Sequence, residues 1–180
     1  MNFIRKILYF DVYFLERCPR VFPKNKSVCG IGNEQIEIET IKENGDATVC
    51  PKMINYPLNV YDAAGASFPD KTIVVCGGYG NEGYGNGYKS ECYRLKNSLW
   101  ESFGHLQTAR SGHAATTIGD SIWFTGGDKL HIVGEGDSEL ATTEILRNDG
   151  TIISGPNLPE ARSNHCQVTF GNTILIIGKL

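Results

Sequence analysis

The chain has 180 residues, of which 41% are hydrophobic and 10% aromatic, and its 20 acidic residues outnumber its 17 Lys and Arg to give a net charge of −3. This composition is typical of a globular protein, and the scattered basic residues form no stripe that would bind nucleic acid phosphates. The 21 glycines favour many short strands joined by turns, and no apolar run reaches the length of about 18 residues that a membrane-spanning helix requires.

The N-terminal segment, residues 1–27, shows no repeated pattern and is poorly readable. Positive charge precedes apolar residues there, but Asp11 interrupts the apolar run before it reaches the length of a signal-peptide core. We expect an irregular edge strand or a short helix that packs its phenylalanines.

Residues 28–52 contain parts of a pattern that returns later in the chain. The glycine-bearing stretch Val28–Glu34 resembles Val75–Glu82, and Glu39–Gly45 matches Glu144–Gly150 at an interval of 105 residues. The two matched stretches end in Asn-Gly and Asp-Gly, which are tight-turn dipeptides, so each predicts a hairpin.

Two copies of one pattern, Leu106–Gly127 and Leu158–Lys179, superpose without gaps. The matching pairs lie 52 residues apart and are Arg110 with Arg162, Ser111 with Ser163, His113 with His165, Gly119 with Gly171, Ile122 with Ile174, and Gly126 with Gly178. In each copy two short runs of β-branched and aromatic residues flank a turn, which predicts a β-hairpin. Residues 53–105 form a weaker copy, because Pro57 and Val60 replace the Arg and His. Self-similarity at this period is typical of a stacked or radial array.

The sequence Ala-Arg-Ser-x-His, followed by an apolar strand that ends in Gly-Gly and then by a strand with Glu, resembles the Kelch repeat. The resemblance implies an all-β fold, an incomplete arc of a Kelch-type β-propeller with four-stranded antiparallel blades. We divide residues 28–180 into a part blade at 28–52, blades at 53–105 and 106–157, and the start of a truncated blade at 158–180. Closed propellers hold about four to eight blades, so we expect a longer chain or an assembly to supply the rest.

The resemblance also implies a non-catalytic scaffold that presents a loop face to an unidentified partner protein, as in substrate-adaptor or cytoskeleton-associated Kelch proteins. If the strands of a blade alternate in direction, the residues before its first strand share a face with the loop between its second and third strands. The predicted partner-binding residues on that face are Arg110, Ser111, Arg162, Ser163, Tyr79, Tyr84 and Tyr88. Guanidinium groups suit carboxylates, and tyrosines amid Gly and Asn are typical of adaptable recognition loops. The alternative for each arginine is a structural role, in which its guanidinium is bonded at the blade junction. The alternative for the tyrosine-bearing loop is an ordinary surface hairpin.

No catalytic residue, cofactor or metal site is predicted. The GxGxxG sequence at Gly78–Gly83 follows an apolar strand, but the glycine-rich residues after it cannot begin the helix that a dinucleotide site requires. His113 and His165 occupy equivalent positions of separate blades and do not converge on one ion. A further alternative for the function, a copper enzyme like galactose oxidase, would require histidines that converge on one copper ion.

The six cysteines do not by themselves decide between an oxidising and a reducing compartment. Cys76 ends the second strand of its blade and Cys92 begins the third, so antiparallel pairing predicts a disulfide if their Cα atoms lie within about 7 Å. A disulfide would favour the alternative of a secreted, extracellular Kelch module, whereas buried reduced thiols would fit a cytoplasmic one.

Overall fold

The computed structural model describes residues 39–41, 47–49, 56–81, 86–130 and 137–178. The chain divides into two units, Met1–Tyr56 and Pro57–Leu180. Of the sequence predictions, the N-terminal segment 1–27, the stretch Val28–Glu34 and Tyr84 lie outside the described residues.

Apart from Tyr56, the described part of the first unit is one hairpin. It consists of β1 (Glu39–Ile41) and β2 (Ala47–Val49), which pair antiparallel in the stretch where the sequence predicts a hairpin. The two strands form a sheet of their own.

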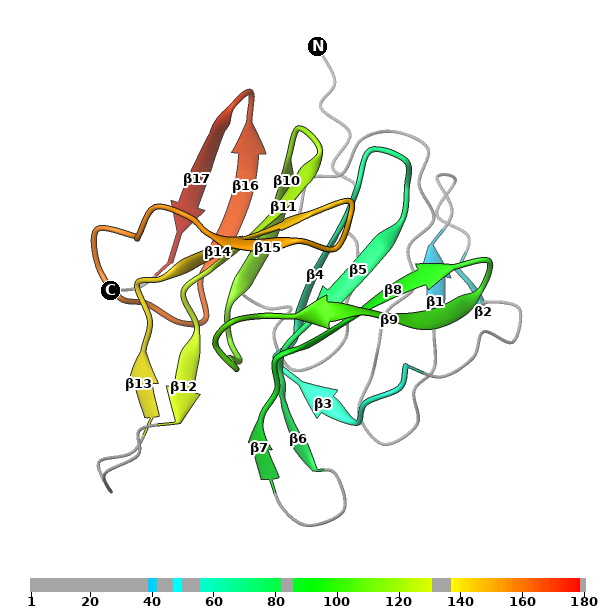
Figure 1. Ribbon diagram of the computed structural model, residues 1–180, viewed down its shortest axis with the longest axis horizontal. Coiled ribbons are helices and arrows are strands. Elements are labelled where there is room, and N and C mark those ends of the chain that lie inside the picture. The colour runs from blue at the N-terminus through cyan, green and yellow to red at the C-terminus, as the bar shows by residue number, and fades with distance from the viewer. Residues whose placement is uncertain (1–38, 42–46, 50–55, 82–85, 131–136, 179–180) are drawn as a thin grey trace. The chain divides into compact units, whose positions relative to one another are not determined.

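The second unit is built from antiparallel modules (Figure 1). Module 1 is a four-stranded sheet in the order β4 (Ala64–Ser67), β5 (Ile73–Cys76), β8 (Glu91–Lys96) and β9 (Leu99–His105). Module 2 repeats this order with β10 (Ala114–Ile118), β11 (Ser121–Thr125), β14 (Thr143–Arg147) and β15 (Ile152–Ser154). Module 3 comprises β16 (Cys166–Phe170) and β17 (Thr173–Ile177).

In each four-stranded module the second and third strands pair directly, and the chain that connects them contributes to a small extra sheet. In module 1 it contains β6 (Tyr79–Asn81) and β7 (Asn86–Tyr88), with β3 (Val60–Tyr61) paired to β6. In module 2 it is the hairpin of β12 (Asp128–Leu130) and β13 (Asp137–Glu139). Figure 1 shows both hairpins extending from the same side of their modules.

The hydrophobic core joins modules 1 and 2. The first strands of the three modules lie side by side, β4 against β10 and β10 against β16. Phe68, Val74, Ile122, Phe124 and Leu146 are buried together at this junction. Removing a large apolar side chain from water contributes about 1.5–3 kcal/mol, so these residues supply much of the adhesion between the modules.

The Gly-Gly pair that ends the second strand links each module to the next. The N–H of Gly78 donates to the carbonyl of Arg110 at 2.8 Å, and the N–H of Gly127 donates to the carbonyl of Arg162 at 2.9 Å. Gly77 has φ 67°, and a Cβ there would lie 2.6 Å from the Arg110 carbonyl oxygen. Glycine is required because the backbone adopts a left-handed conformation where two modules meet.

The prediction of an all-β antiparallel fold is confirmed for the described residues, which contain strands and no helix. No described segment forms a helix with the length and apolar character of a membrane span.

Candidate functional site

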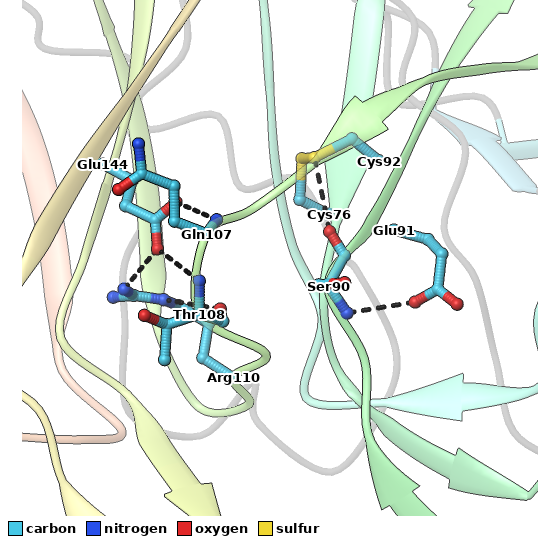
Figure 2. Close-up of a disulfide and its surroundings, with 8 residues drawn as sticks. All are labelled: Cys76, Ser90, Glu91, Cys92, Gln107, Thr108, Arg110 and Glu144. Carbon is cyan, nitrogen blue, oxygen red and sulfur yellow. Dashed lines mark hydrogen bonds and ion pairs between the residues drawn. A yellow bond between two sulfur atoms is a disulfide. The ribbon is translucent and has the colours of Figure 1, made fainter. Parts of the chain in front are cut away.

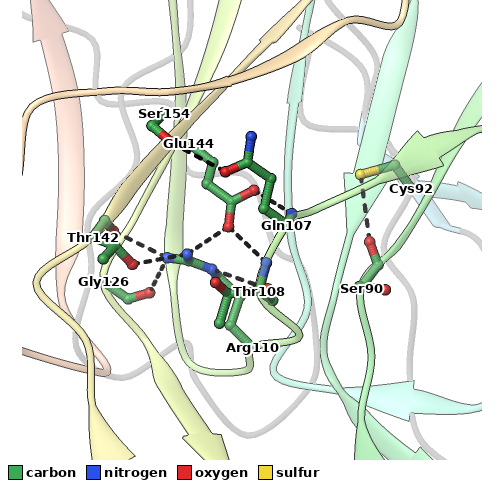
Figure 3. Close-up of polar contacts among 9 residues, drawn as sticks. All are labelled: Ser90, Cys92, Gln107, Thr108, Arg110, Gly126, Thr142, Glu144 and Ser154. Carbon is green, nitrogen blue, oxygen red and sulfur yellow. Dashed lines mark hydrogen bonds and ion pairs between the residues drawn. The ribbon is translucent and has the colours of Figure 1, made fainter.

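Arg110, the residue that opens the first strand of module 2, is buried and bonded within its own module (Figure 3). Its Nη1 donates to the carbonyls of Gly126 at 2.7 Å and Thr142 at 3.0 Å, and its Nη2 donates to Thr142 Oγ1 at 3.0 Å. Nη2 also forms an ion pair with Glu144 Oε1 at 2.7 Å. Burial lowers the pKa of Arg110, and the Glu144 carboxylate opposes that shift.

This geometry corrects the prediction that Arg110 and Ser111 face a partner. The side chain of Arg110 has no exposed surface, and Ser111 is 6% exposed. The backbone of Ser111 exchanges two hydrogen bonds with Asp128, at 3.1 and 2.8 Å, which fixes the start of β12. Both residues therefore have a structural role within the module. The Arg110 guanidinium can be buried because several internal acceptors bind its N–H groups.

Glu144 is the residue that the sequence reasoning missed. Its carboxylate accepts hydrogen bonds from the N–H groups of Gln107 at 2.5 Å and Thr108 at 3.0 Å, in addition to the ion pair with Arg110. The signal was present in the sequence, because Glu39 stands 105 residues earlier at the matching position of the stretch Glu39–Gly45. In module 1 the position of Arg110 is held by Val60 and that of Glu144 by Tyr93, so neither charge of the ion pair is present there.

The second predicted pair, Arg162 and Ser163, is half-buried at the start of module 3. The hydroxyl of Ser163 donates to Glu139 Oε1 at 3.1 Å, which ties it to β13 of the neighbouring module. Ser163 therefore lies beside the β12–β13 hairpin.

Tyr79 and Tyr88 are brought together with a third tyrosine that the sequence reasoning did not single out. The rings of Tyr79 and Tyr88 meet edge to face with centroids 5.1 Å apart, and Tyr61 packs on Tyr79 at 5.4 Å. All three are partly accessible, and Tyr61 is 41% exposed. Aromatic clusters with accessible edges combine large contact area with few rotatable bonds, which suits recognition.

The tyrosine cluster continues into the neighbouring hairpin. β12 lies against β7, and Leu130 on β12 is 67% exposed. We call the surface formed by Tyr61, Tyr79, Tyr88, Leu130 and Ser163 the loop face. It mixes aromatic and aliphatic side chains with polar ones, a composition that protein interfaces share.

Cys76 at the end of β5 and Cys92 near the start of β8 form a disulfide (Figure 2). They are directly opposite one another in the β5–β8 register, with Cα atoms 4.1 Å apart. Both side chains are fully buried, so the bond lies in the core between the modules.

His113 and His165 are buried at the junctions between modules. A Cβ on Gly77 would lie 2.7 Å from His113 Cε1, so the His113 ring fills the space that this glycine leaves open. The Nε2 of His165 is 2.8 Å from Thr125 Oγ1. Burial, with the charge of Arg110 next, lowers the pKa of His113 to about 3, and burial, with Arg162 next, lowers that of His165 to about 4.

These shifts predict a loss of stability in mild acid. The unfolded chain binds a proton at His113 near pH 6.5, whereas the folded chain does not. The free energy of unfolding is therefore unaffected by His113 above pH 6.5 and decreases as the pH falls below that value. The contribution of His113 alone is about 2 kcal/mol at pH 5. Urea unfolding at pH 7.5 and pH 5 measures the change in the free energy of unfolding. In His113→Gln this change should be smaller by that amount. An unchanged profile in the variant, or NMR titration of the His113 ring near pH 6.5, would contradict this prediction.

Among the described residues, no group of three or more His, Cys, Asp and Glu side chains has the arrangement to hold a metal ion.

These elements define an all-β protein of repeated antiparallel modules that presents paired hairpins on one side. No protein-family model matches the chain. Spermatocyte protein spe-26 of Caenorhabditis elegans is 30% identical over 89 residues, which cover 49% of this chain and 15% of that protein. Beta-scruin of Limulus polyphemus is 32% identical over 92 residues, which cover 48% of this chain and 10% of that protein.

Among solved structures, that of YjhT is similar with a TM-score of 0.55 and 12% identity, covering 69% of this chain and 35% of that chain. A likeness at this identity concerns the fold alone. The chain spans a small part of the length of Spermatocyte protein spe-26 and of Beta-scruin.

Proposed function

We propose that the chain is a segment of a Kelch-type β-propeller, a non-catalytic scaffold whose loop face binds a partner protein. Two features support the propeller arrangement: the repeated four-stranded order of modules 1 and 2, and the neighbouring positions of their first strands. The similarity to Beta-scruin is consistent with an interaction role. In this proposal the modules are blades, and the partner is a protein, as for substrate-adaptor or cytoskeleton-associated Kelch proteins.

The observation that carries the binding role is the loop face itself. Two hairpins from neighbouring modules meet there through β7 and β12, and one carries tyrosines of the cluster while the other carries the exposed Leu130. Solvent-exposed apolar side chains beside aromatic edges favour protein contact over catalysis, because they offer area to bury but no nucleophile or acid–base pair.

The test compares matched leucines at opposite ends of the modules. Leu130 is 67% exposed on the loop face, and Leu99 is 47% exposed at the β8–β9 turn. Binding partners are captured with the full chain after chemical crosslinking and identified by mass spectrometry, and the affinity of each purified partner is then measured. Leu130→Ala combined with Tyr61→Ala should weaken binding at least about tenfold, as loss of interface anchors does. Leu99→Ala should leave it unchanged, and the opposite pattern would contradict the loop face.

The secreted Kelch module stays a second candidate because of the Cys76–Cys92 disulfide. Stable disulfides form in oxidising compartments, so this candidate differs from the first in location rather than in fold. Expression of the tagged chain with recovery from the medium in disulfide-bonded form would favour it, and recovery of reduced chain from the cytosol would exclude it.

A further inference from the structure

Three tyrosines form a row across the small sheet of module 1. In the β3–β6 register Tyr61 is directly opposite Tyr79, and in the β6–β7 register Tyr79 is directly opposite Tyr88. Residues that are opposite one another across antiparallel strands project from the same side of the sheet. The three rings therefore lie beside one another on one face, with Tyr79 in the middle.

Glycines on both sides of Tyr79 allow its strand to lie close to β3. A Cβ on Gly78 would lie 2.9 Å from the carbonyl oxygen of Tyr61, and a Cβ on Gly80 would collide with the carbonyl oxygen of Asn59. Only glycine permits so close an approach of two backbones. The strands that carry Tyr61 and Tyr79 are thereby held together, and the centroids of the two rings are 5.4 Å apart.

The orientation of the rings distinguishes the two neighbouring pairs. The planes of Tyr61 and Tyr79 are inclined at 45°, whereas those of Tyr79 and Tyr88 are inclined at 86°. Two aromatic rings that are joined by a carbon–carbon bond are twisted but not perpendicular. The pair of Tyr61 and Tyr79 therefore requires the smaller rotation to be joined, and partly exposed side chains make such adjustments rapidly.

Both members of this pair are accessible to an oxidant. Tyr61 is 41% exposed, and Tyr79 is half-buried. A phenol that loses one electron also releases its proton, which water accepts at an accessible side chain. The unpaired electron of the resulting radical is shared with the ring carbons next to the one that bears the oxygen. Two such radicals on adjacent rings are in position to combine, because the fold has already brought them together.

We propose that Tyr61 and Tyr79 are an oxidative modification site, at which hydrogen peroxide and a peroxidase-type enzyme join the two rings as dityrosine. Each tyrosine loses one electron and one proton, and a carbon–carbon bond forms between a Cε atom of each ring. The two ring hydrogens at the new bond then move to the oxygens, which restores both phenols. Hydrogen peroxide takes up the two electrons and two protons and becomes two molecules of water.

The bond would join β3 covalently to β6 at the base of the loop face. A covalent bond within the chain restricts the unfolded state, so the modified chain should resist urea better than the unmodified one. The reaction requires no partner protein. Its test is therefore independent of the binding role proposed above.

The test treats the full-length chain with hydrogen peroxide and a peroxidase, and maps the products after reduction of the disulfides. Trypsin places Tyr61 in peptide 53–71 and Tyr79 in peptide 72–89, so the predicted bond links these two peptides in one species that lacks two hydrogen atoms. Tyr61→Phe and Tyr79→Phe should each lower the yield of this species at least about tenfold, because each keeps the ring but removes the phenol from the positioned pair.

The chain offers a matched control in Tyr93 on β8. This tyrosine is half-buried like Tyr79, but its neighbours across the sheet are Val75 and Ser102. Tyr93→Phe should therefore leave the yield of the linked peptides unchanged. The same result is expected when Phe replaces each of the other tyrosines of the two peptides, which are Tyr56, Tyr84 and Tyr88.

The outcomes decide the assignment. Linked peptides in the wild type and in Tyr93→Phe, together with their loss in Tyr61→Phe and Tyr79→Phe, support it. A linked species that persists in either of these two variants overturns it, as does a wild-type chain that is not crosslinked or is crosslinked only between molecules. Size-exclusion chromatography in denaturant detects crosslinks between molecules as dimers, and circular dichroism establishes that each variant is folded before oxidation.

Discussion

Replacing Glu144 by Gln is expected to lower the free energy of unfolding by about 3–5 kcal/mol, because it leaves the Arg110 guanidinium buried without its counter-ion. The side chains of Arg110 and Glu144 are 0% and 3% exposed, so water cannot replace the lost charge. Gln also provides a weaker acceptor for the N–H groups of Gln107 and Thr108. Urea unfolding followed by tryptophan fluorescence measures the change.

The chain offers a matched control in the ion pair between Arg94 and Glu101. Its atoms are 3.0 Å apart, similar to the buried pair, but its side chains are 31% and 44% exposed. Glu101→Gln should therefore change the stability by less than about 1 kcal/mol. Equal effects of the two substitutions would show that Glu144 does not hold a buried charge. The double variant Arg110→Met with Glu144→Leu should recover part of the loss, because it leaves no unpaired charge in the core.

The double variant Cys76→Ala with Cys92→Ala is expected to destabilise the chain by about 3 kcal/mol, mainly because the unfolded chain regains the freedom of the closed loop. The two cysteines are separated by 16 residues and fully buried, so loss of their sulfur atoms from the core adds to the effect. Thermal and urea unfolding of oxidised wild type and variant give the difference.

Peptide mapping checks the bond itself. Trypsin cuts after Lys71, Lys89 and Arg94, so peptides 72–89 and 90–94 should be recovered as one linked species without reducing agent. Alkylation of both cysteines in chain that was denatured without reductant would show that they are free. In that case the stability loss of the double variant should shrink to the cost of two small core substitutions.

Much of the fold followed from local pattern. The 52-residue interval and the alternation of turns with β-branched runs predicted the hairpins β10–β11 and β16–β17, because strand propensity and turn chemistry are properties of neighbouring residues. The same pattern placed Cys76 and Cys92 at facing strand ends. The sequence placed a glycine pair at the end of the apolar strand, although it did not show that an N–H of each pair donates to the arginine carbonyl of the next module.

The direction of the Arg110 side chain was decided only by tertiary structure. The sequence offers the same arginine for a partner's carboxylate or for an internal one, and the choice depends on Glu144, 34 residues away along the chain and adjacent only after β11 pairs with β14. The meeting of Tyr61 with Tyr79 likewise requires the pairing of β3 with β6.

By itself, the sequence determined that the chain forms short antiparallel strands in a repeating unit, since each unit encodes its own turns and apolar runs. Only the tertiary structure decided which polar groups are buried as pairs and which side chains reach the loop face, because those outcomes depend on contacts between strands and modules that are distant in sequence.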